Sequence, residues 1–299
     1  MSKLAALDLG SNSFHLLDAT CDQNGLSIGT RIKDKVQIRA GLDSDRNMSQ
    51  SAINRGLDCL KGFQTYIETQ DIQQIAAVGT NTLRIALNSD EFLIQAEEIL
   101  QTTIRVIPGK EEARLIFNGV LNELDNKEPG FVIDIGGGST EFAIGDISGL
   151  SFAESLEMGC VSYYQRFFAD GKIYTENVRA AEKAARLEIE PYLKALTSID
   201  KSWIAGTSGT LQSIAILSHH ICGDKENVLR RESIDDLEKR LILTGHINAI
   251  KTKHLDTNRR EILPAGLAIV RAFFDVLDIK EIQICQSALC EGLLLEMCE

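Results

Sequence analysis

Short apolar segments alternate with glycine and small polar residues along this chain. Residues 131–133 read F-V-I and residues 142–144 read F-A-I, two runs typical of buried strands because they are short and rich in β-branched and aromatic side chains. Between them, residues 134–141 read D-I-G-G-G-S-T-E. A strand follows these glycines, whereas a P-loop or a dinucleotide-binding fingerprint would continue into a helix. The pattern therefore predicts a β-hairpin with a glycine-rich tip.

A similar pattern occurs near the start of the chain. Residues 4–17 read L-A-A-L-D-L-G-S-N-S-F-H-L-L, and aligning Asp8 with Asp134 gives an offset of 126 residues. A second pair of similar segments aligns Gly79 with Gly206 at an offset of 127 residues. Because two independent pairs share nearly one offset, we expect a duplicated α/β unit and two domains that face each other across a cleft.

Hydrophobic periodicity predicts the remaining elements. Proline suits the first turn of a helix, so Pro264 is expected near the start of a helix that continues to Leu277. The polar stretch 122–129 is the expected boundary between domains at 1–124 and 125–299, with the terminal helix able to pack back on the first domain. Further helices are predicted at 49–69, 79–87, 109–124, 175–196, 234–251 and 288–297, and further strands at 72–78, 103–108, 202–205 and 281–285.

Composition narrows the class of protein. The 299 residues are 44% hydrophobic and 25% charged, which indicates a soluble globular protein long enough for two domains. The net charge of −12 argues against a nucleic-acid surface, and no apolar stretch approaches the roughly 18 residues of a membrane span, so we expect a cytoplasmic protein. The seven cysteines are odd in number and contain no C-x-x-C, so reduced thiols are expected, with neither a disulfide framework nor a zinc site.

The hairpin at 134–141 carries the first candidate chemistry. Its three glycines allow backbone N–H groups to point into one space and a bulky anion to approach, as phosphate binding requires. Asp134 and Glu141 would repel phosphate themselves, but they can hold a divalent cation that binds it. The alternative is a glycine-rich hairpin with solvated acids.

Candidate anion-binding and basic groups occur elsewhere in the chain. Arg84 lies in a predicted helix that opens at residues 79–82, where a helix N-terminus suits anions, so it is a candidate phosphate clamp or else a surface ion-pair residue. Residues 206–210, G-T-S-G-T, form a comparable loop before a helix. Glu111 and Glu112 lie in a predicted first helical turn, where the helix dipole favours an ionised carboxylate that can act as a base. Acids in a first turn are also simply good helix starts.

Seven segments in order along nearly the whole chain resemble the exopolyphosphatase and guanosine pentaphosphate phosphohydrolase family, in the actin/Hsp70/sugar-kinase superfamily. These segments are D-L-G-S-N-S-F-H-L-L (8–17), V-G-T-N-T-L-R (78–84), G-K-E-E-A-R-L-I-F-N-G-V (109–120), V-I-D-I-G-G-G-S-T-E (132–141), M-G-C-V-S (158–162), A-G-T-S-G-T (205–210) and I-L-P-A-G (262–266). The resemblance implies an α/β fold of two duplicated actin-like, ribonuclease H-like domains.

The resemblance also implies roles for individual residues. The second glutamate of E-E-A-R, here Glu112, would be the catalytic acid, and Glu111 is the alternative one position earlier. Mg²⁺ or Mn²⁺ would be held by Asp134 and Glu141, with Asp8 as the matching acid of the first hairpin. The implied phosphate contacts are Asn12, Ser13, Arg84, Gly136, Gly137, Gly138, Ser139, Thr140, Gly206, Thr207, Ser208, Gly209 and Thr210.

The expected function is release of terminal phosphate from inorganic polyphosphate. Short chains are expected to be preferred, because the additional helical domain of longer relatives is absent and the net charge repels a long polyanion. The alternatives are hydrolysis of guanosine pentaphosphate, a non-catalytic sensor of guanosine tetra- or pentaphosphate, and a sugar or acetate kinase; a homodimer also stays open.

Gln286, Ser287 and Cys290 depart from the family pattern, which leaves the role of the terminal helix open. Basic residues for a long anion are Arg31, Lys33, Lys35, Arg39, Lys251, Lys253, Arg259 and Arg260.

Overall fold

The computed structural model describes residues 2–199 and 201–298, which divide by their contacts into two units. The first unit comprises Met1–Gly119 and Ser287–Glu299, and the second comprises Val120–Gln286. The division falls after residue 119, inside a helix, where the sequence suggested residue 124. Each unit has its own β-sheet and its own apolar core.

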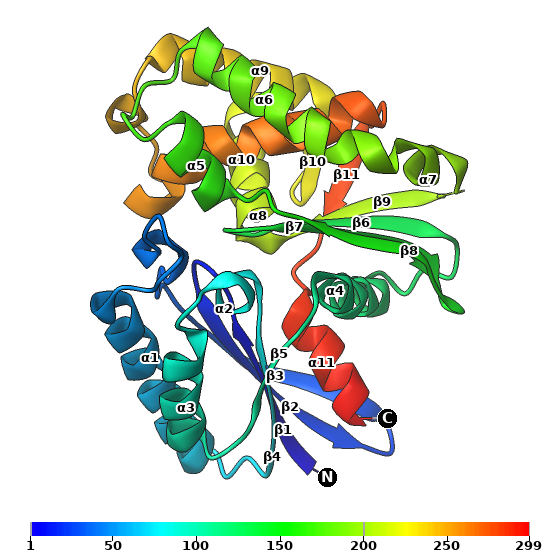
Figure 1. Ribbon diagram of the computed structural model, residues 1–299. Helices are drawn as coiled ribbons and strands as arrows, with labels where there is room; N and C mark the ends of the chain where they lie inside the picture. The colour runs from blue at the N-terminus through cyan, green and yellow to red at the C-terminus, as the bar shows by residue number, and fades with distance from the viewer. Residues whose placement is uncertain (1, 200, 299) are drawn as a thin grey trace. The chain divides into compact units, whose positions relative to one another are not determined.

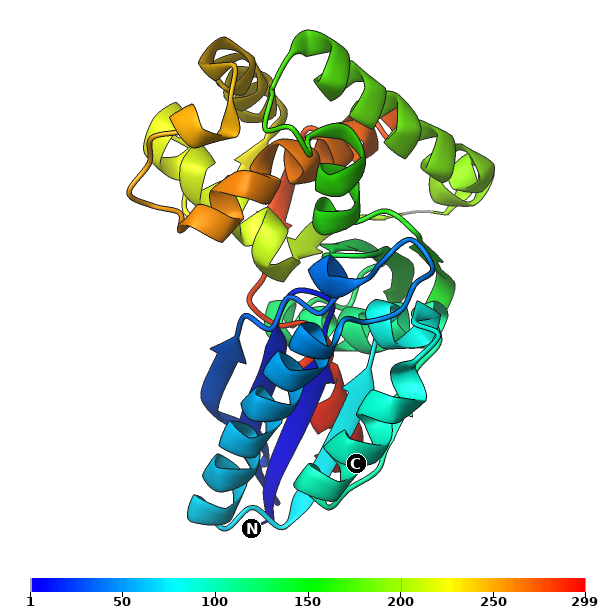
Figure 2. The ribbon, with the colours of Figure 1, turned by 60° about the vertical axis from the view of Figure 1, so that its left-hand side comes forward.

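The first unit is built on a five-stranded sheet of order β3-β2-β1-β4-β5. Its first three strands are antiparallel, and β4 and β5 run parallel to β1. Helices α1 and α3 lie on one face of the sheet and α11 on the other (Figures 1 and 2). The elements are β1 (Ser2–Leu9), β2 (Phe14–Asp22), β3 (Gly25–Asp34), α1 (Gln50–Thr69), β4 (Gln74–Gly79), α2 (Asn81–Ile85), α3 (Ser89–Leu100), β5 (Ile104–Val106), the start of α4 (Gly109–Leu124) and α11 (Leu289–Cys298).

The second unit is built on a six-stranded sheet of order β10-β11-β9-β6-β7-β8. Its strands are β6 (Gly130–Ile135), β7 (Thr140–Asp146), β8 (Gly149–Leu156), β9 (Trp203–Thr207), β10 (Val228–Arg230) and β11 (Glu281–Ile284). Its helices are α5 (Cys160–Phe167), α6 (Thr175–Ile189), α7 (Leu193–Ser198), α8 (Ser208–Leu217), α9 (Arg231–Thr244) and α10 (Thr257–Val276). Short helical turns occur at Arg39–Gly41 in the first unit and at Glu190–Tyr192, Ser218–Cys222 and Ile247–Ala249 in the second.

The two sheets share one topology, which confirms the predicted duplication. In both, an antiparallel trio is followed by two parallel strands, so that β8-β7-β6-β9-β11 repeats β3-β2-β1-β4-β5. Gly79 and Gly206 are equivalent within this repeat, since a leucine of the following helix packs on each. A Cβ added at Gly79 would lie 2.8 Å from Leu83 Cδ1, and one added at Gly206 would lie 2.8 Å from Leu211 Cδ1.

Burial on both faces fixes the two hairpins that carry the glycine loops. All six residues of β6 are buried, and the ring of Phe142 in β7 lies 6.2 Å from that of Phe131 and 5.8 Å from that of Phe273. In the first unit, Phe14 of β2 packs 6.2 Å from Phe92 of α3. Aromatic pairs at this distance add to the hydrophobic stabilisation. Each loop is therefore held between two strands of a packed core.

Helix α10 begins earlier than the sequence analysis expected. It starts at Thr257, with the side chain of Asp256 accepting a hydrogen bond from the Arg259 N–H at 3.0 Å, and Pro264 lies inside it. Proline removes one hydrogen bond from a helix interior, but burial of Ile262 and Leu263 around it offsets that cost. Although α10 has 20 residues, no helix within residues 2–199 and 201–298 combines the length and apolarity needed to cross a membrane.

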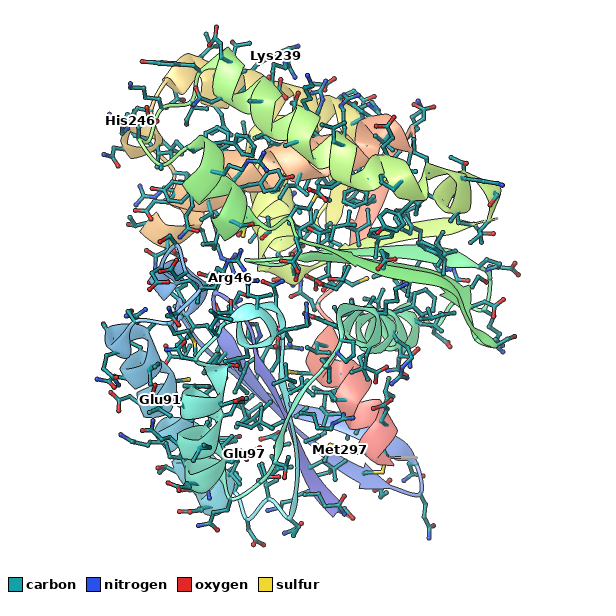
Figure 3. The ribbon with its side chains drawn as sticks, viewed as in Figure 1. Arg46, Glu91, Glu97, Lys239, His246 and Met297 are labelled. Atoms are coloured by element: carbon teal, nitrogen blue, oxygen red, sulfur yellow. A yellow bond between two sulfur atoms is a disulfide. The ribbon has the colours of Figure 1, made fainter. Side chains whose placement is uncertain are left out.

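A disulfide joins Cys21 to Cys298, so the expectation that all the cysteines are reduced is wrong. Their Cα atoms lie 5.8 Å apart although 277 residues separate them in sequence. The bond links β2 to the end of α11, which Met297 marks in Figure 3. It forms because α11 returns to the face of the first sheet, a long-range contact that cysteine spacing does not encode. The other five cysteines are free thiols.

A buried ionic cluster joins three helices of the second unit. The carboxylates of Glu182 in α6 and Glu238 in α9 are nearly inaccessible, and Arg179 lies 2.5 Å from Glu182 Oε2 and 2.8 Å from Glu238 Oε1. Arg271 of α10 lies 3.6 Å from Glu238 Oε2. Burial, followed by the hydrogen bond with Glu238, raises the pKa of Glu182 to about 7.

This cluster predicts a component of stability that is lost towards alkaline pH. Because the folded pKa of Glu182 exceeds its unfolded value near 4.5, its contribution is full below that value and disappears as the pH rises through about 7. Glu182→Gln should therefore weaken the fall in the free energy of unfolding between about pH 5 and pH 8, measured by urea denaturation. Glu188→Gln, exposed on the same helix, is the control and should keep the wild-type slope. An unchanged slope in Glu182→Gln would contradict the assignment.

Candidate functional site

The glycine loop of the second unit is held by the start of α5. The N–H groups of Cys160 and Val161 donate to the carbonyls of Gly136 and Gly137, each at 2.9 Å. These bonds turn the loop carbonyls towards α5. Among the turn and loop hydrogen bonds between backbone groups of the described residues, none is donated by the N–H group of Gly137 or Gly138. Backbone N–H groups of this kind are suited to binding an anion, and the predicted role of the loop in phosphate binding stays a prediction.

Close backbone contact explains the glycine that precedes α5. A Cβ added at Gly159 would lie 2.5 Å from the carbonyl carbon and oxygen of Gly137 and 2.6 Å from the nitrogen of Gly138. On the other side of the loop, Thr140 Oγ1 donates to the Met158 carbonyl at 2.6 Å. Segment 158–162 thus supports the loop, a role that no local pattern in the sequence had indicated.

A row of polar residues crosses four strands beside this loop. Asp134 of β6 pairs directly with Glu141 of β7 and with Thr207 of β9, and Glu141 pairs with Ser155 of β8. Residues directly opposite each other in a sheet point to the same face. Asp134 is 9% exposed and Glu141 is 2% exposed, and Ser155 Oγ donates to Glu141 Oε1 at 2.7 Å. Two carboxylates therefore lie side by side on one face at the end of the glycine loop.

This donor set suits one class of cation. The described residues hold no group of three or more His, Cys, Asp or Glu side chains arranged for a metal, so a closed protein cage of the zinc type does not fit. Mg²⁺ usually takes one or two carboxylates and completes its shell with water and substrate phosphate oxygens. Asp134 and Glu141 fit that second pattern.

The corresponding row of the first unit differs in charge. Asp8 of β1 pairs with His15 of β2, and His15 pairs with Lys33 of β3. In the repeat, His15 therefore takes the place of Glu141, and Lys33 takes the place of Ser155. This row supplies one carboxylate with a basic neighbour where the second unit supplies two carboxylates, so it suits a cation less well.

The loop of the first hairpin gathers polar groups from three segments. Gln37 N–H donates to the Asn12 carbonyl and Arg39 N–H to the Ser11 carbonyl, both at 3.0 Å, which repeats the support that α5 gives the other loop. Thr82 Oγ1 donates to Ser11 Oγ at 2.7 Å. The hydroxyl of Ser13 is buried and has no partner among the described residues. The loop that contains the candidate phosphate contacts Asn12 and Ser13 is thus in contact with α2, through Ser11 and Thr82.

Arg84 and Glu112 form an ion pair within the first unit. Arg84 Nη1 lies 3.2 Å from Glu112 Oε2 and donates to the Ile107 carbonyl at 2.8 Å. The side chains are 22% and 9% exposed, so this is not the solvated surface pair considered as the alternative. Glu111 instead pairs with Arg114 at 2.7 Å, and that hydrogen bonding lowers the pKa of Glu111. Of the two adjacent acids, Glu112 is the one held beside Arg84.

The loop at 206–210 packs against the same support as the glycine loop. Thr210 Oγ1 lies 3.3 Å from Cys160 Sγ, so Cys160 contacts both candidate phosphate loops of the second unit. Ser208 adopts a φ of 90°, a left-handed conformation that non-glycine residues rarely hold without compensation. A Cβ at Gly209 would overlap the guanidinium of Arg259, which places this basic group directly on the loop.

The fold and these residues define an α/β protein of two units that share one sheet topology, each with a supported hairpin loop. The sequence profile of the Ppx/GppA phosphatase family matches residues 19–299, so the chain belongs to that family. The predicted resemblance and the assignment to a phosphatase-type hydrolase are therefore confirmed.

Three solved structures share this fold over nearly the whole length of both chains. An exopolyphosphatase from Cytophaga hutchinsonii is 22% identical with a TM-score of 0.90, and the alignment covers 99% of this chain and 98% of that one. The PPX-GPPA enzyme of Aquifex aeolicus is 22% identical with a TM-score of 0.82 and coverage of 99% of each chain. An exopolyphosphatase-like protein is 24% identical with a TM-score of 0.86 and coverage of 99% and 97%.

The support of the glycine loop by Gly159 yields a prediction. Gly159→Ala should displace the loop and lower kcat/KM for phosphate release from tripolyphosphate by about 100-fold, the usual effect of misplacing a binding group by about 1 Å. Gly62→Ala is the matched control, because a Cβ added there meets nothing within 4 Å. Circular dichroism checks that both variants fold. Wild-type kinetics in Gly159→Ala would show that the loop does not depend on this contact.

Proposed function

We propose that this chain hydrolyses phosphoanhydride bonds and releases the terminal phosphate of inorganic polyphosphate. The observation that carries the proposal lies in the second unit, where the available N–H groups of Gly137 and Gly138 adjoin the carboxylates of Asp134 and Glu141. Amide donors bind phosphate oxygens, and paired carboxylates bind the cation that accompanies them. Membership of the phosphatase family and the exopolyphosphatase named among the structural neighbours support the same reaction.

The proposal assigns Asp134 and Glu141 to Mg²⁺ or Mn²⁺. A divalent cation bound there would neutralise negative charge on the phosphate oxygens. The chain itself contributes the burial of both carboxylates, which keeps their geometry fixed. The glycine-loop amides orient the phosphoryl group, and Ser139 and Thr140 extend the same loop.

The proposal assigns Glu112 the role of general base in the first unit. Its carboxylate would accept the proton of a water molecule whose oxygen bonds to phosphorus, while the bridging P–O bond breaks and the departing phosphate takes the electron pair. Arg84, 3.2 Å away, fixes one carboxylate oxygen of Glu112 and brings a positive charge suited to phosphate. Asn12 and Ser13 provide further polar contacts in the same unit.

Substrate choice rests on electrostatics. The net charge of −12 repels a long polyanion at long range, so we propose that short polyphosphate chains are preferred. Arg259 at the 206–210 loop and Arg39, which donates to Asn81 Oδ1 at 2.8 Å, provide local positive charge for a short anion. Guanosine pentaphosphate carries the same type of terminal phosphate and remains the alternative substrate, and a guanosine nucleotide sensor is the non-catalytic alternative.

Replacing the candidate base tests the mechanism. Glu112→Gln should lower kcat by about 10²- to 10⁴-fold, the usual range for loss of a general base, with a far smaller effect on KM. Glu111→Gln is the control, because that carboxylate is paired with Arg114 away from Arg84. The reverse result, with Glu111→Gln inactive and Glu112→Gln active, would place the base one residue earlier.

A comparison of substrates tests the function itself. The measurement is kcat/KM for release of phosphate from tripolyphosphate, long-chain polyphosphate and guanosine pentaphosphate at fixed ionic strength with Mg²⁺. We expect the highest value for tripolyphosphate. A preference for the long chain would contradict the electrostatic argument, and activity on guanosine pentaphosphate alone would favour the alternative substrate. Tight binding of the nucleotide without any phosphate release would identify a sensor.

A further inference from the structure

Ser155 belongs to the polar row of the second sheet, and the proposed function gives it no role. We propose that Ser155 is a positioning residue, which orients the carboxylate of Glu141 and thereby sets the affinity of the second unit for a divalent cation. This inference rests on the proposed function, since it assumes that Glu141 binds the cation. It concerns residues of a single unit.

The geometry of the two strands carries the inference. Glu141 and Ser155 are directly opposite each other in the antiparallel pair β7–β8, so their side chains share one face. Ser155 Oγ donates to Glu141 Oε1 at 2.7 Å, a distance usual for an O–H···O hydrogen bond. Glu141 is only 2% exposed, so water cannot readily replace this donor. The hydroxyl therefore holds one oxygen of the carboxylate in place.

The hydrogen-bond donor to Glu141 at position 155 has to be uncharged if this carboxylate is to bind a cation. A positively charged donor would also orient Glu141, but it would oppose a cation at the same carboxylate. The duplicated sheet provides the comparison, because Lys33 occupies the place of Ser155 in the row that contains Asp8 and His15. The unit with two adjacent carboxylates thus has a hydroxyl at the position where the unit with one carboxylate has an ammonium group.

Removal of the Ser155 hydroxyl should change the affinity for a metal more than the stability of the fold. Loss of a group that orients a metal ligand typically lowers metal affinity or activity by 10- to 100-fold. Ser155 is partly exposed on β8, so removal of its hydroxyl leaves the packing of the sheet nearly unchanged. Threonine retains the hydroxyl and favours the strand conformation, and it should therefore preserve the interaction.

Binding of Mn²⁺ to the full chain tests the inference directly. Free Mn²⁺ is measured by electron paramagnetic resonance after removal of metals from the protein, without any substrate. We expect Ser155→Ala to raise the Kd for Mn²⁺ about 10-fold and Ser155→Thr to stay within about twofold of the wild type. Ser151→Ala, an exposed serine on the same strand, is the control and should leave Kd unchanged. Circular dichroism and thermal unfolding establish that each variant folds.

Two results with the variants, and one with the wild type, would overturn the role of Ser155. One is wild-type affinity for Mn²⁺ in Ser155→Ala, and the other is an equal loss in Ser155→Ala and Ser155→Thr, which would show that the hydroxyl is not the cause. A wild-type chain that binds no Mn²⁺ would also overturn the inference, along with the cation role of Asp134 and Glu141.

Phosphate release by the wild type, measured separately, decides the proposed activity. If Ser155→Ala weakens Mn²⁺ binding but the wild type releases no phosphate from any substrate, the positioning role stands and the activity fails. If the wild type releases phosphate and Ser155→Ala binds Mn²⁺ normally, only the role of Ser155 fails. In an active enzyme, we expect Ser155→Ala to need about 10-fold more Mn²⁺ for half-maximal rate and to recover kcat at saturation.

Discussion

Backbone hydrogen bonds from the start of α5 hold the glycine loop of the second unit in its conformation. The first N–H groups of a helix have no partner within it, and such groups are often available to anions. In α5 three of these donors are instead used by the protein, since the N–H groups of Cys160, Val161 and Ser162 donate to the carbonyls of Gly136 and Gly137. The consequence is that the carbonyls of the loop point to α5, and the proposed phosphate binding depends on the N–H groups of Gly137 and Gly138. The close contact at Gly159 follows from the same arrangement.

Duplication supplied the framework of the two units, and substitution within it produced different chemistry. Both hairpins end a central strand with an aspartate, and a neighbouring segment donates to the carbonyls of both loops. The cross-strand partners then differ, with Glu141 in one unit and His15 in the other. Because neighbouring positions in a sheet row are only about 5 Å apart, one such change alters the local charge decisively. The second row therefore combines two carboxylates with a hydroxyl, whereas the first combines one carboxylate with two basic side chains.

The sequence predicts the features that local patterns encode. The hairpins, their glycines and the repeat could be recognised because apolar strands and turn residues are adjacent in the chain. The start of α10 was misplaced at Pro264, although Asp256 provides a recognisable cap signal for a start at Thr257. The contact of Ser155 with Glu141 and the disulfide of Cys21 with Cys298 could not be predicted, because each depends on pairing between segments whose register only the fold defines.

The C-terminal helix supports the helix that carries Glu112. In the first unit, α4 and α11 pack backbone against backbone, since a Cβ at Gly119 would overlap the Ala288 carbonyl and one at Gly292 would overlap the Leu115 carbonyl. Glycine at both positions permits this approach. The disulfide links the C-terminal end of α11 to β2, and the Arg114 guanidinium donates a hydrogen bond to the Glu296 carboxylate. Since α11 contacts both the sheet and α4, the position of Glu112 at the start of α4 depends on the last residues of the chain.

Cys290 belongs to this support. Its side chain is fully buried in α11, and burial raises the pKa of its thiol well above the ordinary value. A thiol in that state stays protonated at neutral pH and acts as a small apolar group, so its contribution is packing against the strand that carries Asp8. On the same helix, the buried carboxylate of Glu291 forms an ion pair with Arg31 of β3. Cys290 is thus one of the buried residues of α11, the helix that packs on the first sheet.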